Sequence, residues 1–132
     1  MKKKIAILGS TGSIGKTTFN IVKKNRKEFE VVLLTTNKNI SEIYKQARIL
    51  KTKNIFITSK PHYLKAKKKL KKSNLRIYNN LNVLKKIFKK KIDYTMCAIS
   101  GLEGLRPTLD VIQFTKNIAI ANKESLICGW NL

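Results

Sequence analysis

Residues 5–15 read Ile5-Ala-Ile-Leu8-Gly9-Ser-Thr-Gly12-Ser-Ile-Gly15 and set the architecture of this 132-residue chain. Four apolar residues suit a buried strand, and the apolar residues over 14–22 recur with helical spacing. Glycines let the turn between them bend sharply and approach a pyrophosphate, whose charge the free amides at the helix start hold. The order of strand, glycine turn and helix predicts a dinucleotide site, although GxxGxxG departs from the commoner GxGxxG spacing.

The rest of the chain repeats this alternation. Strands are expected at 5–8, 31–34, 55–57, 76–78, 94–99 and 118–121. Helices are expected at 14–22, at 40–50, around 65–72, around 85–91, and from Pro107, which suits a first helical turn, to about Phe114. Strands that alternate with helices require right-handed crossovers, so both faces of the sheet are covered. The sequence therefore predicts a Rossmann-type, doubly wound α/β domain with a mostly parallel sheet.

Lysine gives the chain a high charge. Lys and Arg total 29 against 7 Asp and Glu, a net charge of +22, which raises the question of nucleic acid. The excess is concentrated in 65–72 and 85–91, beside apolar residues at helical spacing. These apolar residues are Leu64, Leu70 and Leu75, and then Leu81, Leu84, Ile87 and Phe88. Neither stretch has interleaved aromatics and arginine is scarce, so solvated helix faces are favoured over a basic nucleic-acid-binding module.

Composition also bears on the compartment. The length suits one core, no apolar run reaches the roughly 18 residues of a membrane helix, and the apolar stretch after the first lysines is too short for a signal peptide. Cys97 and Cys128 stand in apolar stretches, which is typical of buried thiols in a reducing compartment. We therefore expect a cytoplasmic protein without membrane association.

The glycine turn also overlaps a P-loop pattern. Ser10-Thr-Gly-Ser-Ile-Gly15-Lys16-Thr17 matches GxxxxGK[ST] except that Ser10 replaces the first glycine. Lys16 would then reach the β- and γ-phosphates, and Thr17 would bind magnesium. Such an enzyme also needs an acidic residue at a strand end to hold the ion, and none of the expected strands is followed directly by Asp or Glu. A P-loop nucleotide hydrolase is therefore the less favoured alternative.

The end of the second expected strand indicates which dinucleotide binds. A fold that prefers NAD usually places an acid there, about 20 residues past the glycines, on the ribose 2′-hydroxyl. This sequence instead has Thr35-Thr36-Asn37-Lys38-Asn39. A 2′-phosphate would be repelled by a carboxylate and attracted by Lys38. The residues therefore favour NADP, with an ordinary surface lysine as the alternative at this position.

Several blocks taken together resemble one family. They are Ile7-Leu-Gly-Ser-Thr-Gly-Ser-Ile-Gly15, Lys38-Asn39, Ala98-Ile99 with Gly104-Leu-Arg-Pro-Thr108, and the most specific, Ile120-Ala-Asn-Lys-Glu-Ser-Leu126. Their order and spacing are similar to those of the NADPH-binding domain of 1-deoxy-D-xylulose 5-phosphate reductoisomerases. The resemblance implies a homodimeric enzyme that converts 1-deoxy-D-xylulose 5-phosphate to 2-C-methyl-D-erythritol 4-phosphate in non-mevalonate isoprenoid biosynthesis. That family rearranges the carbon skeleton on a divalent metal (Mg or Mn) and then delivers hydride from NADPH.

The resemblance also implies roles for individual residues. The pyrophosphate would be contacted by Thr11, Gly12, Ser13 and Ile14, and the ribose 2′-phosphate would be surrounded by Asn37, Lys38 and Asn39. The cofactor would also be touched by Asn122 and Glu124, whereas Lys123 would reach the substrate, since a lysine beside the nicotinamide can pair with an anion. At position 37 the family more often has glycine. Because Asn tolerates a positive φ better than other side-chain residues, the loop is expected to survive.

The resemblance does not extend to a complete enzyme. The family's metal ligands, an Asp-Ser-Glu segment and a later Glu, are expected beyond Leu132, and the seven acids of this chain are scattered. The last residues, Gly129-Trp-Asn-Leu132, also leave the family pattern. We therefore expect 1–132 to be an NADPH-binding domain, a fragment that lacks the catalytic and C-terminal domains and is inactive alone.

Overall fold

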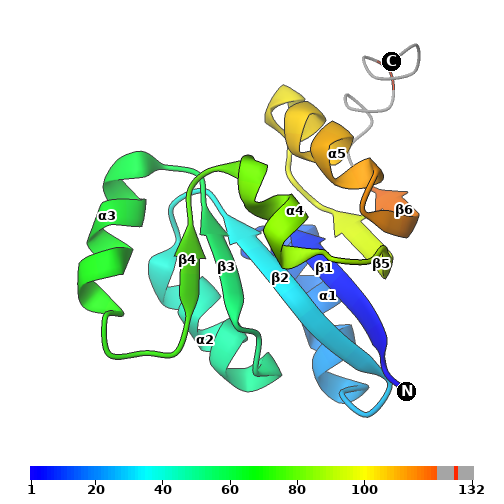
Figure 1. The fold of residues 1–132 in the computed structure, drawn as a ribbon, viewed down its shortest axis with the longest axis horizontal. Coiled ribbons are helices and arrows are strands. Elements are labelled where there is room, and N and C mark those ends of the chain that lie inside the picture. Colours follow the sequence, from blue (N-terminus) through cyan, green and yellow to red (C-terminus); the bar gives the residue numbers. More distant parts are fainter. Residues whose placement is uncertain (122–126, 128–132) are drawn as a thin grey trace.

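The computed structural model describes residues 1–121 and 127 and contains a six-stranded sheet (Figure 1). Every pair of neighbouring strands is parallel. Across the sheet the strands are β4 (Arg76–Tyr78), β3 (Asn54–Ile57), β2 (Phe29–Thr36), β1 (Lys3–Leu8), β5 (Ile92–Cys97) and β6 (Thr115–Ile120). The chain thus winds outward from β1 in both directions, and the predicted doubly wound architecture is confirmed.

Helices cover both faces of the sheet (Figure 1). They are α1 (Ser13–Lys24), α2 (Ile40–Leu50), α3 (Lys60–Lys69), α4 (Leu84–Ile87) and α5 (Leu105–Ile112), with 3-10 turns at Leu81–Val83 and Leu102–Gly104. Alternate residues of β1 enter different cores, as the two-residue period of a strand requires. Ile5 and Ile7 pack with α1, α2 and α3, whereas Ala6 and Leu8 pack with residues of α4 and α5. The sheet is therefore buried between two apolar layers.

The lysine-rich helices differ most from the sequence expectation. The helix expected around 85–91 ends at Ile87, because buried Phe88 leaves the helical conformation (φ −106°, ψ 89°) and anchors the chain. The last three lysines of that stretch lie outside any helix. In α3 the expected apolar face is wrong at Leu64, which is 51% exposed, while Ala66 is fully buried. The reason is that α3 packs on β3 and β4, at the edge of the sheet, through Ala66 with Tyr63 beside it, so that Leu64 is left outside this contact.

The boundaries of some strands also differ from those expected from the apolar runs. The ladder extends β1 back to Lys3, which pairs with Phe29, and β6 back to Thr115, which pairs with Ile92. Backbone pairing does not require apolar side chains, so the exposed Lys3 and the buried but polar Thr115 both join the strands. Conversely, β5 ends at Cys97 rather than at 99.

The thiol of Cys97 is buried, as expected, and its burial raises its pKa to about 11, partly opposed by a hydrogen bond with Thr108. The other cysteine, Cys128, lies outside the described residues.

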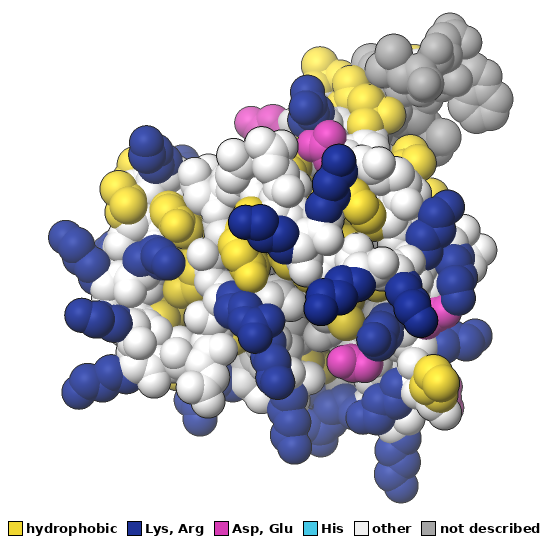
Figure 2. All heavy atoms as spheres, viewed as in Figure 1, with side chains coloured by type: hydrophobic (Ala, Val, Ile, Leu, Met, Phe, Trp, Pro, Cys, Tyr) yellow, Lys and Arg dark blue, Asp and Glu magenta, His cyan; other side chains and the backbone are white. Residues whose placement is uncertain are grey.

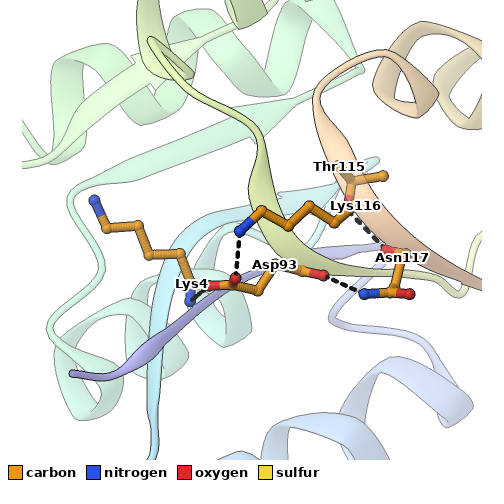
Figure 3. Close-up of polar contacts among 5 residues, drawn as sticks. All are labelled: Lys4, Asp93, Thr115, Lys116 and Asn117. Carbon is orange, nitrogen blue, oxygen red and sulfur yellow. Dashed lines mark hydrogen bonds and ion pairs between the residues drawn. The ribbon is translucent and has the colours of Figure 1, made fainter.

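Three strands are tied together at their amino ends by Asp93 of β5 (Figure 3). Its Oδ2 accepts a hydrogen bond from the Lys4 backbone N–H at 2.8 Å, and the Lys116 Nζ lies 3.2 Å from Oδ1. The Asn117 side-chain amide also donates to the Asp93 backbone carbonyl at 3.2 Å. The Lys4 amide, and then the Lys116 ammonium, lower the pKa of the Asp93 carboxyl because both favour its charged form.

The surface is strongly basic. Figure 2 shows lysine and arginine side chains spread over the visible face, with few acidic side chains among them. In the part of the chain that the structure describes, no helix combines the length and the apolar character needed to cross a bilayer.

Candidate nucleotide-binding site

The site lies at the carboxyl edge of the sheet, beside β1. This strand stands between β2 and β5, so the winding direction changes beside it. In open α/β sheets, ligands bind in the crevice outside the carboxyl ends of the strands at such a switch point. Gly9 follows β1 and Ala98 follows β5, and a Cβ on Gly9 would lie 3.0 Å from the Ala98 carbonyl carbon. The two strand ends therefore meet closely where the glycine turn begins.

The three glycines of the turn have different reasons to be glycine. Gly9 has a φ of +75°, and a Cβ on Gly15 would lie 2.0 Å from the Gly9 carbonyl oxygen. Both positions therefore need glycine for the fold itself. A Cβ on Gly12 would have its nearest neighbour at 3.7 Å, and Gly12 is exposed, with an ordinary φ of −78°. The protein's own packing does not explain the glycine at position 12, whereas close approach of a ligand would.

The amino end of α1 opens at this turn. Gly12 is its N-cap residue, no side chain caps the helix, and its first turn holds no acid. The first amides of a helix have no partner within the helix and carry the positive end of its dipole. Ser13 and Ile14 are exposed, so this end of α1 is accessible to an anion.

The loop between β2 and α2 lies beside the glycine turn. Its residues Asn37, Lys38 and Asn39 are all exposed. The Asn39 side chain caps α2 by accepting a hydrogen bond from the Glu42 backbone N–H at 3.2 Å, and the Asn37 carbonyl accepts one from the Ser59 N–H at 3.0 Å. The positive φ considered for Asn37 is not adopted, since among the described residues only Lys51 has a positive φ without being glycine. The loop is thus held by its backbone and its cap, and Lys38 projects from it.

Two threonines at the end of β2 join this loop to the glycine turn. Thr35 accepts a hydrogen bond from Gly9 N–H through its Oγ1 at 2.8 Å, and its carbonyl accepts one from Ser10 N–H at 2.9 Å. The Oγ1 atoms of Thr11 and Thr36 are 2.6 Å apart. The structure therefore brings the residues predicted at 11–14 and 37–39 to adjacent loops. Sequence reasoning missed these contacts, although two hydroxyl residues at the end of a buried strand were a visible signal.

A buried glutamine on α2 supports the glycine turn. Gln46 of α2 is fully buried, and its Nε2 donates to the Ser10 carbonyl at 3.0 Å and to Glu42 Oε1 at 3.2 Å. Sequence reasoning missed this residue as well. Gln46 stands beside Ala47 on the buried side of the helix, and nothing in the local pattern shows what a polar side chain there would contact.

The remaining predicted residues cannot be placed in this way. Asn122, Lys123 and Glu124, which were expected to contact cofactor or substrate, lie outside the described residues. The metal ligands of the family were expected beyond Leu132. Within residues 1–121 and 127, no group of three or more His, Cys, Asp or Glu side chains is placed to hold a metal ion.

The P-loop alternative is not supported. Lys16 is exposed on α1, and the Thr17 hydroxyl donates to the Ser13 carbonyl one turn earlier. None of the six described strands is followed directly by an acid, so the magnesium-holding residue of such an enzyme has no counterpart among them.

The sheet order, the glycine turn at the switch point and the open helix end define a Rossmann-type domain of the nucleotide-binding class. The model of the family described as "1-deoxy-D-xylulose 5-phosphate reductoisomerase" matches residues 5–129. The chain therefore belongs to the 1-deoxy-D-xylulose 5-phosphate reductoisomerase family, as its sequence blocks predicted.

Individual relatives agree with this assignment. The reductoisomerase of Pelagibacter ubique is 54% identical over 132 residues, covering 98% of this chain and 34% of the relative. That of Wolbachia pipientis from Culex pipiens is 37% identical over 131 residues, again covering 98% and 34%. The solved Zymomonas mobilis enzyme in complex with NADPH superposes with a TM-score of 0.85 at 32% identity, covering 96% of this chain and 34% of that one. A reductoisomerase solved with magnesium gives a TM-score of 0.82 at 28% identity, covering 96% and 32%. The chain thus spans about a third of the length of these relatives.

Proposed function

We propose that this chain is the NADPH-binding part of a 1-deoxy-D-xylulose 5-phosphate reductoisomerase and that it prefers NADPH to NADH. The observation that carries the proposal is the junction of two loops. The open amino end of α1 and the acid-free loop around Lys38 are held side by side by the contact between Thr11 and Thr36. The NADPH complex of the Zymomonas mobilis relative supports the same cofactor.

The pyrophosphate fits the glycine turn. Gly12 leaves room for a phosphate against the backbone, and the amides of Ser13 and Ile14 stand at the positive end of α1. Thr11 presents a hydroxyl at the same opening. The four residues 11–14 therefore form a cradle for two phosphates in which the backbone supplies most of the donors.

The adenosine 2′-phosphate fits the neighbouring loop. Lys38 supplies an ammonium group there, and residues 35–39 contain no carboxylate that would repel a phosphate or bind a free 2′-hydroxyl. Asn37 and Asn39 flank the lysine, and the oxygen of Asn39 is engaged by the start of α2. Its amide nitrogen remains a donor for a phosphate oxygen.

The proposal also concerns the reaction of the whole family enzyme. Bound NADPH supplies the hydride that reduces the rearranged 1-deoxy-D-xylulose 5-phosphate. In this chain Asn122 and Glu124 would contact the cofactor and Lys123 would pair with the anionic substrate. We further propose that residues 1–132 are one NADPH-binding domain and that the family enzyme is a cytoplasmic homodimer with no specific nucleic-acid partner.

Cofactor choice tests the core of the proposal. NADPH and NADH are titrated separately against the 132-residue chain, with the fluorescence of the reduced nicotinamide as the signal. NADPH is expected to bind more than tenfold tighter, a difference of about 1.4 kcal/mol. Lys38→Glu should narrow or reverse that preference, and Lys60→Glu serves as a control on the neighbouring helix. Equal affinity of the unaltered chain for both cofactors would overturn the proposal.

Turnover tests the domain assignment. The family rearrangement needs a metal with hard oxygen ligands, and the described residues supply no such cluster. The chain, incubated with NADPH, substrate and magnesium or manganese, should show no NADPH oxidation by absorbance. Steady oxidation that disappears in Lys123→Ala would show that this chain holds a complete active site.

A further inference from the structure

In the described part of the chain, the Thr36 hydroxyl is hydrogen-bonded both to the glycine turn and to the loop of residues 37–39. Its Oγ1 lies 2.6 Å from Thr11 Oγ1 in the glycine turn and accepts a hydrogen bond from Asn39 N–H, at 3.3 Å, in the loop that carries Lys38. Thr36 is 3% exposed, so water does not substitute for these partners. The two loops that would hold the two phosphate groups are therefore linked through this side chain.

The direction of the contact between Thr11 and Thr36 follows from counting donors. Each hydroxyl has one proton, and Thr36 already accepts from Asn39 N–H. If Thr11 donated, the Thr36 proton would be buried without an acceptor among the described residues, and an unsatisfied buried donor is costly. If Thr36 donates, the partly exposed Thr11 keeps its own proton for an acceptor outside the protein. The second arrangement leaves no buried hydroxyl proton of this pair without an acceptor.

We propose that Thr36 is a positioning residue that couples the 2′-phosphate loop to the pyrophosphate turn, and thereby sets part of the preference for NADPH. The proposal rests on the function proposed above. Asn39 N–H donates to Thr36, Thr36 donates to Thr11, and Thr11 donates to a pyrophosphate oxygen. Hydrogen bonds in such a chain polarise one another, so ordering of the Lys38 loop by a 2′-phosphate strengthens the donor offered to the pyrophosphate. NADH, which lacks that phosphate, gains nothing from the link.

Isosteric substitutions separate this coupling from simple support. Thr36→Val keeps the shape and removes the link, whereas Thr36→Ser keeps the hydroxyl. Thr35→Val is the matched control, because the Thr35 hydroxyl contacts only Gly9 N–H in the glycine turn. Affinities for NADPH and NADH are measured for each variant by fluorescence titration, with circular dichroism to show that each is folded. Thr36→Ala, which cannot overfill the site, replaces Thr36→Val if the valine variant does not fold.

Thr36→Val is expected to narrow the NADPH-to-NADH affinity ratio at least threefold, mainly by weakening NADPH. Thr36→Ser should keep the ratio, and Thr35→Val should weaken both cofactors by similar factors and leave the ratio unchanged. A ratio that is unaltered in Thr36→Val, or equally altered in Thr35→Val, would overturn the coupling. If the unaltered chain itself shows no preference, the proposed function fails and the coupling fails with it. If Lys38→Glu changes the ratio and Thr36→Val does not, only the coupling fails.

Discussion

The side-chain amide of Gln46 donates a hydrogen bond to the Ser10 carbonyl across 3.0 Å, joining the buried side of α2 to the glycine turn. The two residues are 36 positions apart in the chain and are both fully buried. The Gln46 Oε1 atom has no hydrogen-bond partner among the described residues. The glycine turn is therefore held by the Gln46 side-chain amide, whose nitrogen donates to the turn and whose oxygen has no partner in this part of the chain.

This contact predicts an order of stability. Gln46→Met leaves the buried Ser10 carbonyl without this donor but also removes the unpartnered Gln46 oxygen, so the two effects partly offset and the net cost should be about 1 kcal/mol. Gln46→Glu places a carboxylate against the Ser10 carbonyl and beside Glu42 in a buried site, which should cost at least about 2 kcal/mol. Urea unfolding of both variants at pH 7 measures the difference. A Gln46→Met variant as stable as the unaltered chain would mean that the donor does not support the turn.

The glycines predict a separation of folding from binding. Gly15→Ala forces a Cβ to within 2.0 Å of the Gly9 carbonyl oxygen, so the backbone must move and the cost should be about 3 kcal/mol or more. Gly12→Ala has space and an ordinary φ, so its stability should change by less than about 0.5 kcal/mol. Its methyl group would nevertheless occupy the phosphate cradle and weaken NADPH at least about tenfold. Thermal unfolding measures the stability of each variant, and cofactor titration measures its affinity for NADPH. If Gly12→Ala bound NADPH as tightly as the unaltered chain does, the placement of the pyrophosphate would be contradicted.

Asp93 predicts a dependence of stability on acid. Its folded pKa lies below the ordinary value of 3.8 because of the Lys4 amide and Lys116. Its contribution is therefore present above pH 3.8 and is lost as the pH falls through the lower folded pKa. Asp93→Asn should be less stable than the unaltered chain at pH 6, and the gap should shrink at pH 3 and below. Asp110→Asn is the control, since Asp110 pairs with an exposed arginine in the same helix. A gap that is the same at both pH values contradicts the prediction.

The net charge of +22 predicts weak association with any polyanion. Lysine and arginine side chains are spread over the face shown in Figure 2, so binding of DNA or RNA should be independent of sequence. It should also fall steeply between about 50 and 200 mM salt as counterions compete. Filter binding with two unrelated duplexes over a salt series checks both points. Retention of one defined sequence at physiological salt would instead support the nucleic-acid-binding module.

Much of the fold follows from local sequence. The short apolar run before the glycine turn predicts a strand, and the apolar spacing of Ile43 and Ala47 predicts a helix, because both patterns depend on near neighbours. The missing acid and the presence of Lys38 are likewise visible in five consecutive residues. Local patterns were less informative at α3, where packing on the edge strands decided which side chains are buried, and at α4, where the burial of Phe88 ended the helix.

Contacts between distant residues came only from the folded chain. The link between Thr11 and Thr36 and the support of Ser10 by Gln46 join positions 25 and 36 residues apart, and a hydroxyl or amide in a sequence does not specify its partner. Parallel pairing of β1 with β2 brings their carboxyl ends to one edge, so two loops that are separate in sequence become one surface. The strand, the glycine turn and the lysine loop could thus be predicted from local sequence. The hydrogen bonds that hold the two loops together depend on sheet register and burial, which only the tertiary structure decides.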